Sequence, residues 1–147
     1  MIIKVKVKIE STIENLDEFG LIAGEAEKSV TEVNGIYRYA DDVTFLAFAE
    51  ESEGGKINTN VFCFGDSVTV KREGAVESNM QFAVGESHSS IYSIPPYQFD
   101  VTVNAKRVKT ELFAVGGSID LLYNMKIGGA DKNARMKIWI SQASKQA

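Results

Sequence analysis

The chain has almost none of the cysteine and histidine residues that stabilise small domains through disulfides or bound metal. Its 147 residues include one cysteine, Cys63, and one histidine, His88. A single cysteine excludes an internal disulfide, and one cysteine with one histidine leaves too few ligands for a structural zinc site. We therefore expect no metal and no cofactor. The domain must be stabilised by its apolar core, and a chain of this length buries roughly 70% of the surface that its unfolded form exposes.

Long hydrophobic runs are also missing. No segment approaches the ~20 consecutive apolar residues of a membrane-spanning helix, and residues 1–10 lack the order of charged, apolar and small residues that defines a signal peptide. We expect a cytoplasmic protein with no membrane segment. The 16 Lys and Arg residues against 20 Asp and Glu residues give a net charge of −4. This charge disfavours nucleic acid as a partner, because the phosphate backbone is itself negative.

The sequence does contain the two-residue alternation of β-strands. In residues 3–10, isoleucine and valine alternate with lysine and glutamate, which is typical of a strand with one buried and one solvated face. Residues 14–24 lose this alternation and are expected to form a loop. Residues 25–33 carry mixed signals and are interpreted as a strand, and Asn34-Gly35 is interpreted as a hairpin turn.

Further extended runs follow, separated by short turns rich in Gly, Pro, Asp and Ser. The runs are residues 43–50, 56–64, 67–72, 75–84, 87–94, 97–109, 118–127 and 134–140. Connections this short join only antiparallel neighbours. We predict an all-β fold, a single closed antiparallel meander β-barrel of about 8 to 10 strands, because closure removes exposed sheet edges. The barrel spans residues 1–147 as one domain, with residues 141–147 as a frayed tail.

The second half of the chain resembles a known family. The stretches that carry the resemblance are Gly74-Ala75-Val76, Met80-Gln81-Phe82, Gly85, Tyr92, Gly117, Ile119, Tyr123-Asn124-Met125 and residues 136–140. In these stretches the chain is similar to the YwiB-like family, bacterial proteins of unknown function with a lipocalin-like, calycin-type β-barrel. The resemblance is clearest over residues 70–140, and it implies the barrel and a bacterial cytoplasmic setting. Its motifs are structural, so it implies no catalytic residue.

Aromatic and methionine side chains on the expected strands suggest a function. A barrel of eight or more strands can hold one small ligand when its inward side chains do not fill it. We predict that the following residues line the barrel and bind such a ligand: Phe62, Phe64, Met80, Phe82, Tyr92, Phe99, Tyr123 and Met125. The alternative is that these side chains form a filled core with no cavity. The favoured function is a noncatalytic barrel that binds a small, mostly apolar ligand.

A second interpretation uses the outer face of the barrel. Basic residues at positions 4–8 and 106–109, with Tyr37 and Tyr39, could form a patch for single-stranded RNA or for a protein partner. The simpler interpretation is a charged strand face that keeps the sheet soluble. An unpaired edge strand would also allow a homodimer.

A third interpretation is an unrecognised hydrolase, suggested by His88 among serines. Adjacent strand residues point to opposite faces, so Ser87 and Ser89 cannot share a side with His88. Cys63 has no neighbouring base and is interpreted as a small buried hydrophobe. We therefore predict no catalytic residue.

Overall fold

The computed structural model describes residues 1–143 and forms one antiparallel sheet of ten strands. The strands are β1 (Ile3–Asn15), β2 (Glu27–Arg38), β3 (Thr44–Ser52), β4 (Gly55–Phe64), β5 (Ser67–Gly74), β6 (Ser78–Phe82), β7 (Ser87–Ile94), β8 (Tyr97–Phe113), β9 (Gly116–Ile127) and β10 (Ala130–Gln142). Their order in the sheet is β6-β5-β4-β3-β2-β1-β10-β9-β8-β7. The first and last strands of the chain, β1 and β10, are therefore neighbours. Within residues 1–143, no helix is long and apolar enough to span a membrane.

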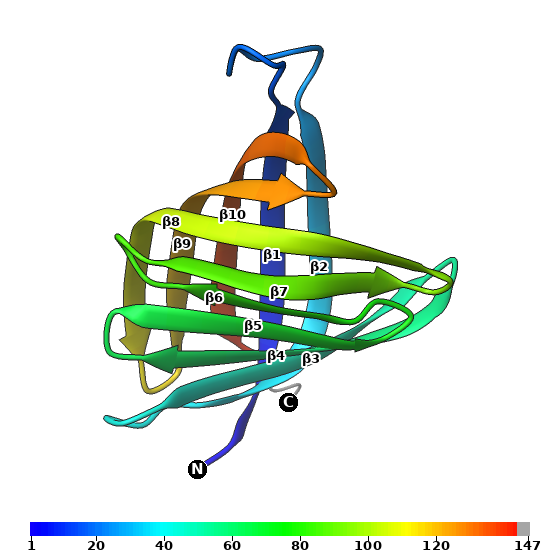
Figure 1. Cartoon of the computed structure of the whole chain (residues 1–147). Coiled ribbons are helices and arrows are strands. Elements are labelled where there is room, and N and C mark those ends of the chain that lie inside the picture. Colours follow the sequence, from blue (N-terminus) through cyan, green and yellow to red (C-terminus); the bar gives the residue numbers. More distant parts are fainter. Residues whose placement is uncertain (144–147) are drawn as a thin grey trace.

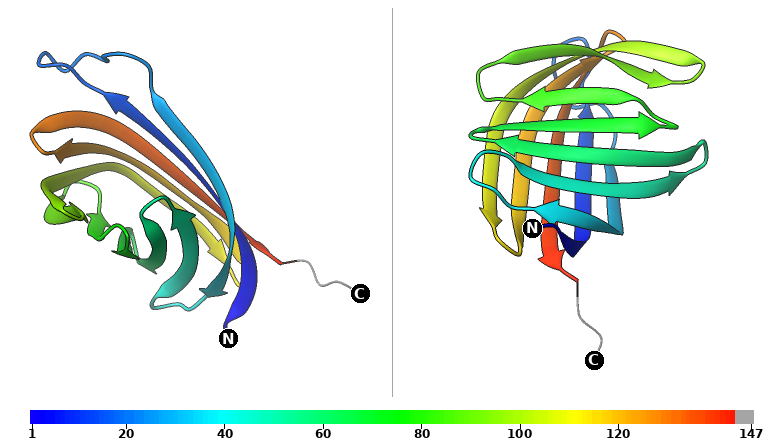
Figure 2. Two further views of the ribbon diagram at one scale, coloured as in Figure 1. Left: turned by 90° about the vertical axis from the view of Figure 1, so that its right-hand side faces the viewer. Right: turned by 90° about the horizontal axis from the view of Figure 1, so that it is seen from below.

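The sheet curls until its two outermost strands meet. In Figure 1, β3 to β7 run crosswise in front of β1, β10 and β9, and the two views of Figure 2 show two curved layers facing each other. Beside the outermost strands, Glu77 immediately before β6 and Ser93 of β7 exchange two backbone hydrogen bonds of 2.9 and 2.8 Å. The barrel is therefore nearly closed, and the predicted all-β antiparallel barrel is confirmed.

Side-chain alternation decides which residues form the core. On β1, Val5, Val7 and Ile9 are buried, while the lysines between them face solvent. The same alternation on the other strands places valine, isoleucine, leucine and methionine side chains in one apolar cluster between the two layers. The core therefore lies inside the barrel, where burial of apolar surface is the main source of stability.

The hairpin turn predicted at Asn34-Gly35 is wrong. Both residues lie inside β2, and Gly35 pairs with Val5 on one side and with Phe48 on the other. A Cβ atom at Gly35 would lie 2.6 Å from the carbonyl oxygen of Ala47. Glycine at this position therefore serves a close approach of backbones within a strand, which the Asn-Gly dipeptide does not distinguish from a turn.

The frayed tail predicted for residues 141–147 is wrong at its beginning. Ser141 and Gln142 belong to β10 and pair with Lys6 and Val5. The amide of Ala143 donates a 3.1 Å hydrogen bond to the carbonyl oxygen of Lys4. These residues carry no apolar pattern, but backbone pairing with β1 satisfies their polar groups without one. The remainder of that prediction, residues 144–147, lies outside the described residues.

Candidate functional site

A cavity of about 220 Å³ lies inside the barrel. Its wall is formed by Ser11, Ile13, Val70, Arg72, Ser78, Met80, Phe82, Tyr92, Tyr123, Met125, Ile127, Lys132 and Met136. These residues come from β1, β5, β6, β7, β9 and β10, so both layers contribute. Apolar cavities of about 150 Å³ are large enough to bind benzene, and this cavity is therefore large enough for a small organic molecule.

The inner wall of the cavity is apolar. Phe82 is fully buried, and its ring packs edge-on against Tyr123 with the two ring centroids 4.8 Å apart. Three buried methionines, Met80, Met125 and Met136, complete this wall. The methionine side chain is unbranched and polarizable, so it adapts to the shape of what it contacts. We call these five residues the floor of the cavity.

Two half-buried, positively charged side chains also line the cavity. Arg72 on β5 and Lys132 on β10 both line the cavity and are partly accessible to solvent. The Nζ atom of Lys132 donates a 2.6 Å hydrogen bond to Oδ1 of Asn15, which is a neutral acceptor. Among the residues that the structure describes, no Asp or Glu side chain lines the cavity. We call Arg72 and Lys132 the rim cations. The cavity thus combines an apolar floor with a cationic rim.

Five of the eight residues that the sequence assigned to the barrel lining do line this cavity: Met80, Phe82, Tyr92, Tyr123 and Met125. Their part in binding a ligand stays a prediction. Both rim cations and Met136 were not predicted as lining residues from the sequence. Arg72 could have been found, because it follows Val68 and Val70 at two-residue spacing on the inward face of β5.

The inward placement of Phe62 and Phe64 is wrong. Both rings are on the outer face of β4, 38% and 63% exposed, because Val61 and Cys63 occupy the inward positions. Phe62 instead packs against Phe45 on the neighbouring strand, with the ring centroids 5.2 Å apart. The physical reason is that this stretch of β4 is apolar at every position, so the alternation of side chains alone does not choose its inner face.

The cavity placement of Phe99 is also wrong. Phe99 pairs with Tyr92 and shares its inward face, but it lies near the start of β8, where it is 39% exposed. It lies beside Gly128 in the β9–β10 turn. Phe99 has the predicted inward orientation. It does not line the cavity because it lies near the end of the barrel.

The structure also places the two residues that the sequence considered for nucleophilic chemistry, Cys63 and His88. Burial raises the pKa of the Cys63 thiol to about 12, which keeps the thiol protonated and unreactive at neutral pH. The Nδ1 atom of His88 is buried and has no hydrogen-bond partner within residues 1–143. The hydroxyl groups of Ser87 and Ser89 contact Asn104 and Thr102 on the outer face of β8. His88 therefore forms no pair with either flanking serine. No group of three or more His, Cys, Asp or Glu side chains among the described residues could hold a metal ion.

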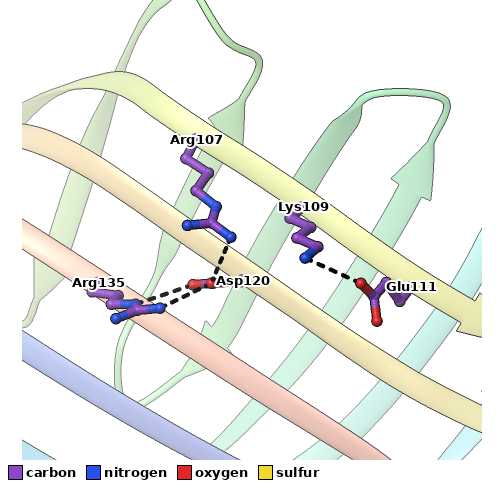
Figure 3. A network of polar contacts seen from close by, with 5 residues as sticks. All are labelled: Arg107, Lys109, Glu111, Asp120 and Arg135. Carbon is purple, nitrogen blue, oxygen red and sulfur yellow. Dashed lines mark hydrogen bonds and ion pairs between the residues drawn. The ribbon is translucent and has the colours of Figure 1, made fainter.

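The outer face of β8, β9 and β10 contains an ion-pair network (Figure 3). Nε and Nη2 of Arg135 donate hydrogen bonds of 3.2 and 3.0 Å to the carboxylate of Asp120, and Arg107 lies 3.8 Å from the same carboxylate. The hydrogen bond from Arg135 lowers the pKa of Asp120. Lys109 pairs with Glu111 at 3.2 Å. Three of the basic side chains on this face are thus paired with two carboxylates, because Arg107 and Arg135 share Asp120.

Of the two predicted aromatic members of the outer basic patch, Tyr39 is 41% exposed and Tyr37 is not exposed. Tyr37 is fully buried, and its hydroxyl donates a 2.7 Å hydrogen bond to the carbonyl oxygen of Phe113, so its placement on the patch is wrong. The outer face of β10 instead presents Trp139, which is 36% exposed. The Nζ atoms of Lys8 and Lys137 lie 5.5 and 5.7 Å from its ring centroid, within the range of cation–π attraction.

The chain is similar to proteins that are themselves uncharacterised. It is 28% identical over 105 residues to the uncharacterized beta-barrel protein YwiB of Bacillus subtilis (strain 168), a match that covers 71% of this chain and 74% of the relative. The crystal structure of the ywiB protein from Bacillus subtilis superposes with a TM-score of 0.84 at 24% identity, covering 97% of this chain and 94% of the other. That likeness shows a common fold. A family model described as a domain of unknown function, DUF1934, matches residues 7–140, and the chain therefore belongs to the DUF1934 family.

Proposed function

We propose that this protein is a noncatalytic barrel that binds a small, mostly apolar ligand in its internal cavity. The observation that supports this proposal is the floor of the cavity, in which Phe82, Tyr123 and three methionines surround about 220 Å³ of space. Pockets that bind small molecules are concave, mostly apolar and carry a few polar groups. A cytoplasmic location, as expected from the sequence, is part of the proposal.

The residues of the floor also favour a cavity that a ligand fills. A well-packed core leaves few voids larger than a water molecule, and each void forfeits dispersion contacts. An apolar cavity beside Met80, Met125 and Met136 therefore lowers stability when empty, and a ligand that fills it restores those contacts. Ligand binding would therefore raise the free energy of unfolding and offset the loss that the empty cavity causes.

The four methionines of the chain offer a direct test. Met80, Met125 and Met136 line the cavity, whereas Met1 is 97% exposed and serves as an internal control. We would label the methionine methyl groups with carbon-13 and titrate the protein with 1-octanol while recording two-dimensional NMR spectra. Leucine substitutions at single methionines would assign the signals at little cost in stability.

The proposal predicts saturable shifts of the three cavity methyl groups and no shift of the Met1 methyl group. Equal drift of all four signals would indicate nonspecific solvent effects and contradict a defined site. A titration without any shift of the cavity signals, in protein that remains folded, would likewise count against an accessible cavity.

A second candidate function uses the outer face around Trp139. An exposed tryptophan flanked by Lys8 and Lys137 is a suitable platform for stacking a base next to phosphate-binding cations. The test is a titration with oligouridylate that follows tryptophan fluorescence at increasing salt concentration. Binding through phosphates must weaken linearly on a log–log scale with salt. Unchanged fluorescence at low salt would dispose of this candidate.

A further inference from the structure

We propose that the rim cations Arg72 and Lys132 bind the anionic head of a small amphipathic carboxylate whose apolar part occupies the floor of the cavity. This inference rests on the proposed function and adds the chemical class of the ligand. The geometry that carries it is the juxtaposition of two half-buried cations with an apolar cavity wall that contains no carboxylate.

Arg72 is placed as a binding group and not as part of a surface ion pair. Its β5 neighbour Lys71 points outward and pairs with Glu73 at 3.4 Å. Within residues 1–143, by contrast, Arg72 has no carboxylate within the 4 Å limit of a salt bridge. Glu50 lines an adjoining cavity together with Arg72 but does not line the cavity that contains the floor. A partly desolvated guanidinium without a counter-charge is costly, and an anion would remove that cost.

The surroundings of Arg72 add hydroxyl groups. Arg72 pairs in register with Thr59 of β4 and with Ser78 of β6, so all three side chains share the inward face. Thr59 is only 2% exposed, and its Oγ1 atom has no hydrogen-bond partner within residues 1–143. Of these two hydroxyl residues, Ser78 lines the cavity together with Arg72, whereas Thr59 does not line it. Ser78 therefore adds a hydrogen-bonding group to the rim of the cavity.

The floor reinforces the amphipathic character of the ligand. Tyr123 is 4% exposed and lines the same cavity of about 220 Å³ as Arg72 and Lys132. One small molecule in this cavity would therefore contact both the cationic rim and the apolar floor. A carboxylate suits the planar fork of arginine, which can bind it through two parallel hydrogen bonds.

The experiment compares octanoate with 1-octanol, which has the same apolar tail and no charge. Isothermal titration calorimetry at neutral pH would measure both affinities for the parent protein, for Arg72→Gln and for Lys71→Gln. The last variant removes the same charge from the outer face of the same strand. We expect octanoate to bind the parent more tightly than octanol. Arg72→Gln should weaken octanoate binding about ten- to a hundredfold, the range of a charge-assisted hydrogen bond. It should leave octanol binding unchanged.

The possible results separate this proposal from the proposed function. If the parent binds octanol at least as tightly as octanoate, or if Arg72→Gln weakens both alike, the anionic ligand is refuted while the apolar binding barrel stands. If neither compound binds or shifts the cavity methionine signals, both proposals fall. A loss of octanoate binding in Lys71→Gln equal to that in Arg72→Gln would show a general charge effect and would also refute the inference. An Arg72→Lys variant should retain part of the preference for octanoate, because the positive charge remains.

Discussion

Replacing Phe82 by alanine tests the internal architecture, with Phe64→Ala as its matched control. Phe82 is fully buried and packs against Tyr123 at a ring-centroid distance of 4.8 Å, while Phe64 is 63% exposed on the outer face. Removing a buried phenylalanine side chain costs about 3 to 5 kcal/mol through lost burial and the space it leaves. The same truncation on the surface should change the free energy of unfolding by at most about 0.5 kcal/mol. Phe82→Ala should therefore be destabilised far more strongly than Phe64→Ala.

Equilibrium unfolding in urea measures this difference. Fluorescence of the single tryptophan, Trp139, and circular dichroism should report one coincident transition, which justifies a two-state free energy. The reasoning would be refuted if Phe64→Ala lost as much stability as Phe82→Ala, because the inner face of β4 would then be the opposite of the one described. A loss below about 1 kcal/mol for Phe82→Ala would also refute it, because a ring at the cavity floor cannot be removed so cheaply.

Further predictions follow from single contacts. Tyr37→Phe removes the hydroxyl that donates to a β8 carbonyl group and should cost about 1 to 3 kcal/mol of unfolding free energy in the same urea assay. The Cys63 thiol, whose pKa is raised to about 12 by burial, should resist iodoacetamide at pH 8 in the folded protein and react once urea unfolds it; rapid native labelling would contradict its burial. The hydrogen bond from Arg135 lowers the pKa of Asp120 below its ordinary value of 3.8. The stabilising effect of Asp120 is therefore complete above pH 3.8 and is lost as pH falls through the lower pKa of the folded state. Asp120→Asn should flatten this part of the curve of unfolding free energy against pH. Gly74 has a φ of 115°, so Gly74→Ala should destabilise the protein by about 1 to 3 kcal/mol, measured as a lower thermal midpoint.

Strands with a clear alternation were the predictable part of the fold. The pattern of Val5, Val7 and Ile9 determines both the strand and its buried face, and β1 has that face inward. The end of a strand is less predictable, because Ser141 and Gln142 pair through backbone atoms that leave no side-chain signal. Gly35 was misinterpreted for a similar reason: glycine serves both turns and close backbone approach, and only the neighbouring strand decides between them.

The candidate site was predictable only in part. Met80 and Phe82 alternate with polar residues, so their inward direction follows from the sequence. The stretch around Phe62 is apolar at every position, so the sequence does not decide which of its side chains face inward. The cavity itself depends on how far apart the two layers lie around its lining residues. That spacing comes from the curl of the whole sheet and from no local pattern. Lys132 was missed because it resembles an ordinary charged strand residue, whereas the two-residue spacing of Arg72 after Val68 and Val70 already indicated its inward placement.

The most direct test of the binding barrel is native mass spectrometry of the protein purified from a bacterial cytoplasm without exposure to denaturant. The binding barrel predicts a reproducible small mass on the folded chain that leaves on denaturation. If that ligand is the proposed carboxylate, its occupancy falls in Arg72→Gln and stays at the parental level in Lys71→Gln. A folded protein that carries no such mass, and whose cavity methionine signals do not respond to octanol or octanoate, would contradict the account.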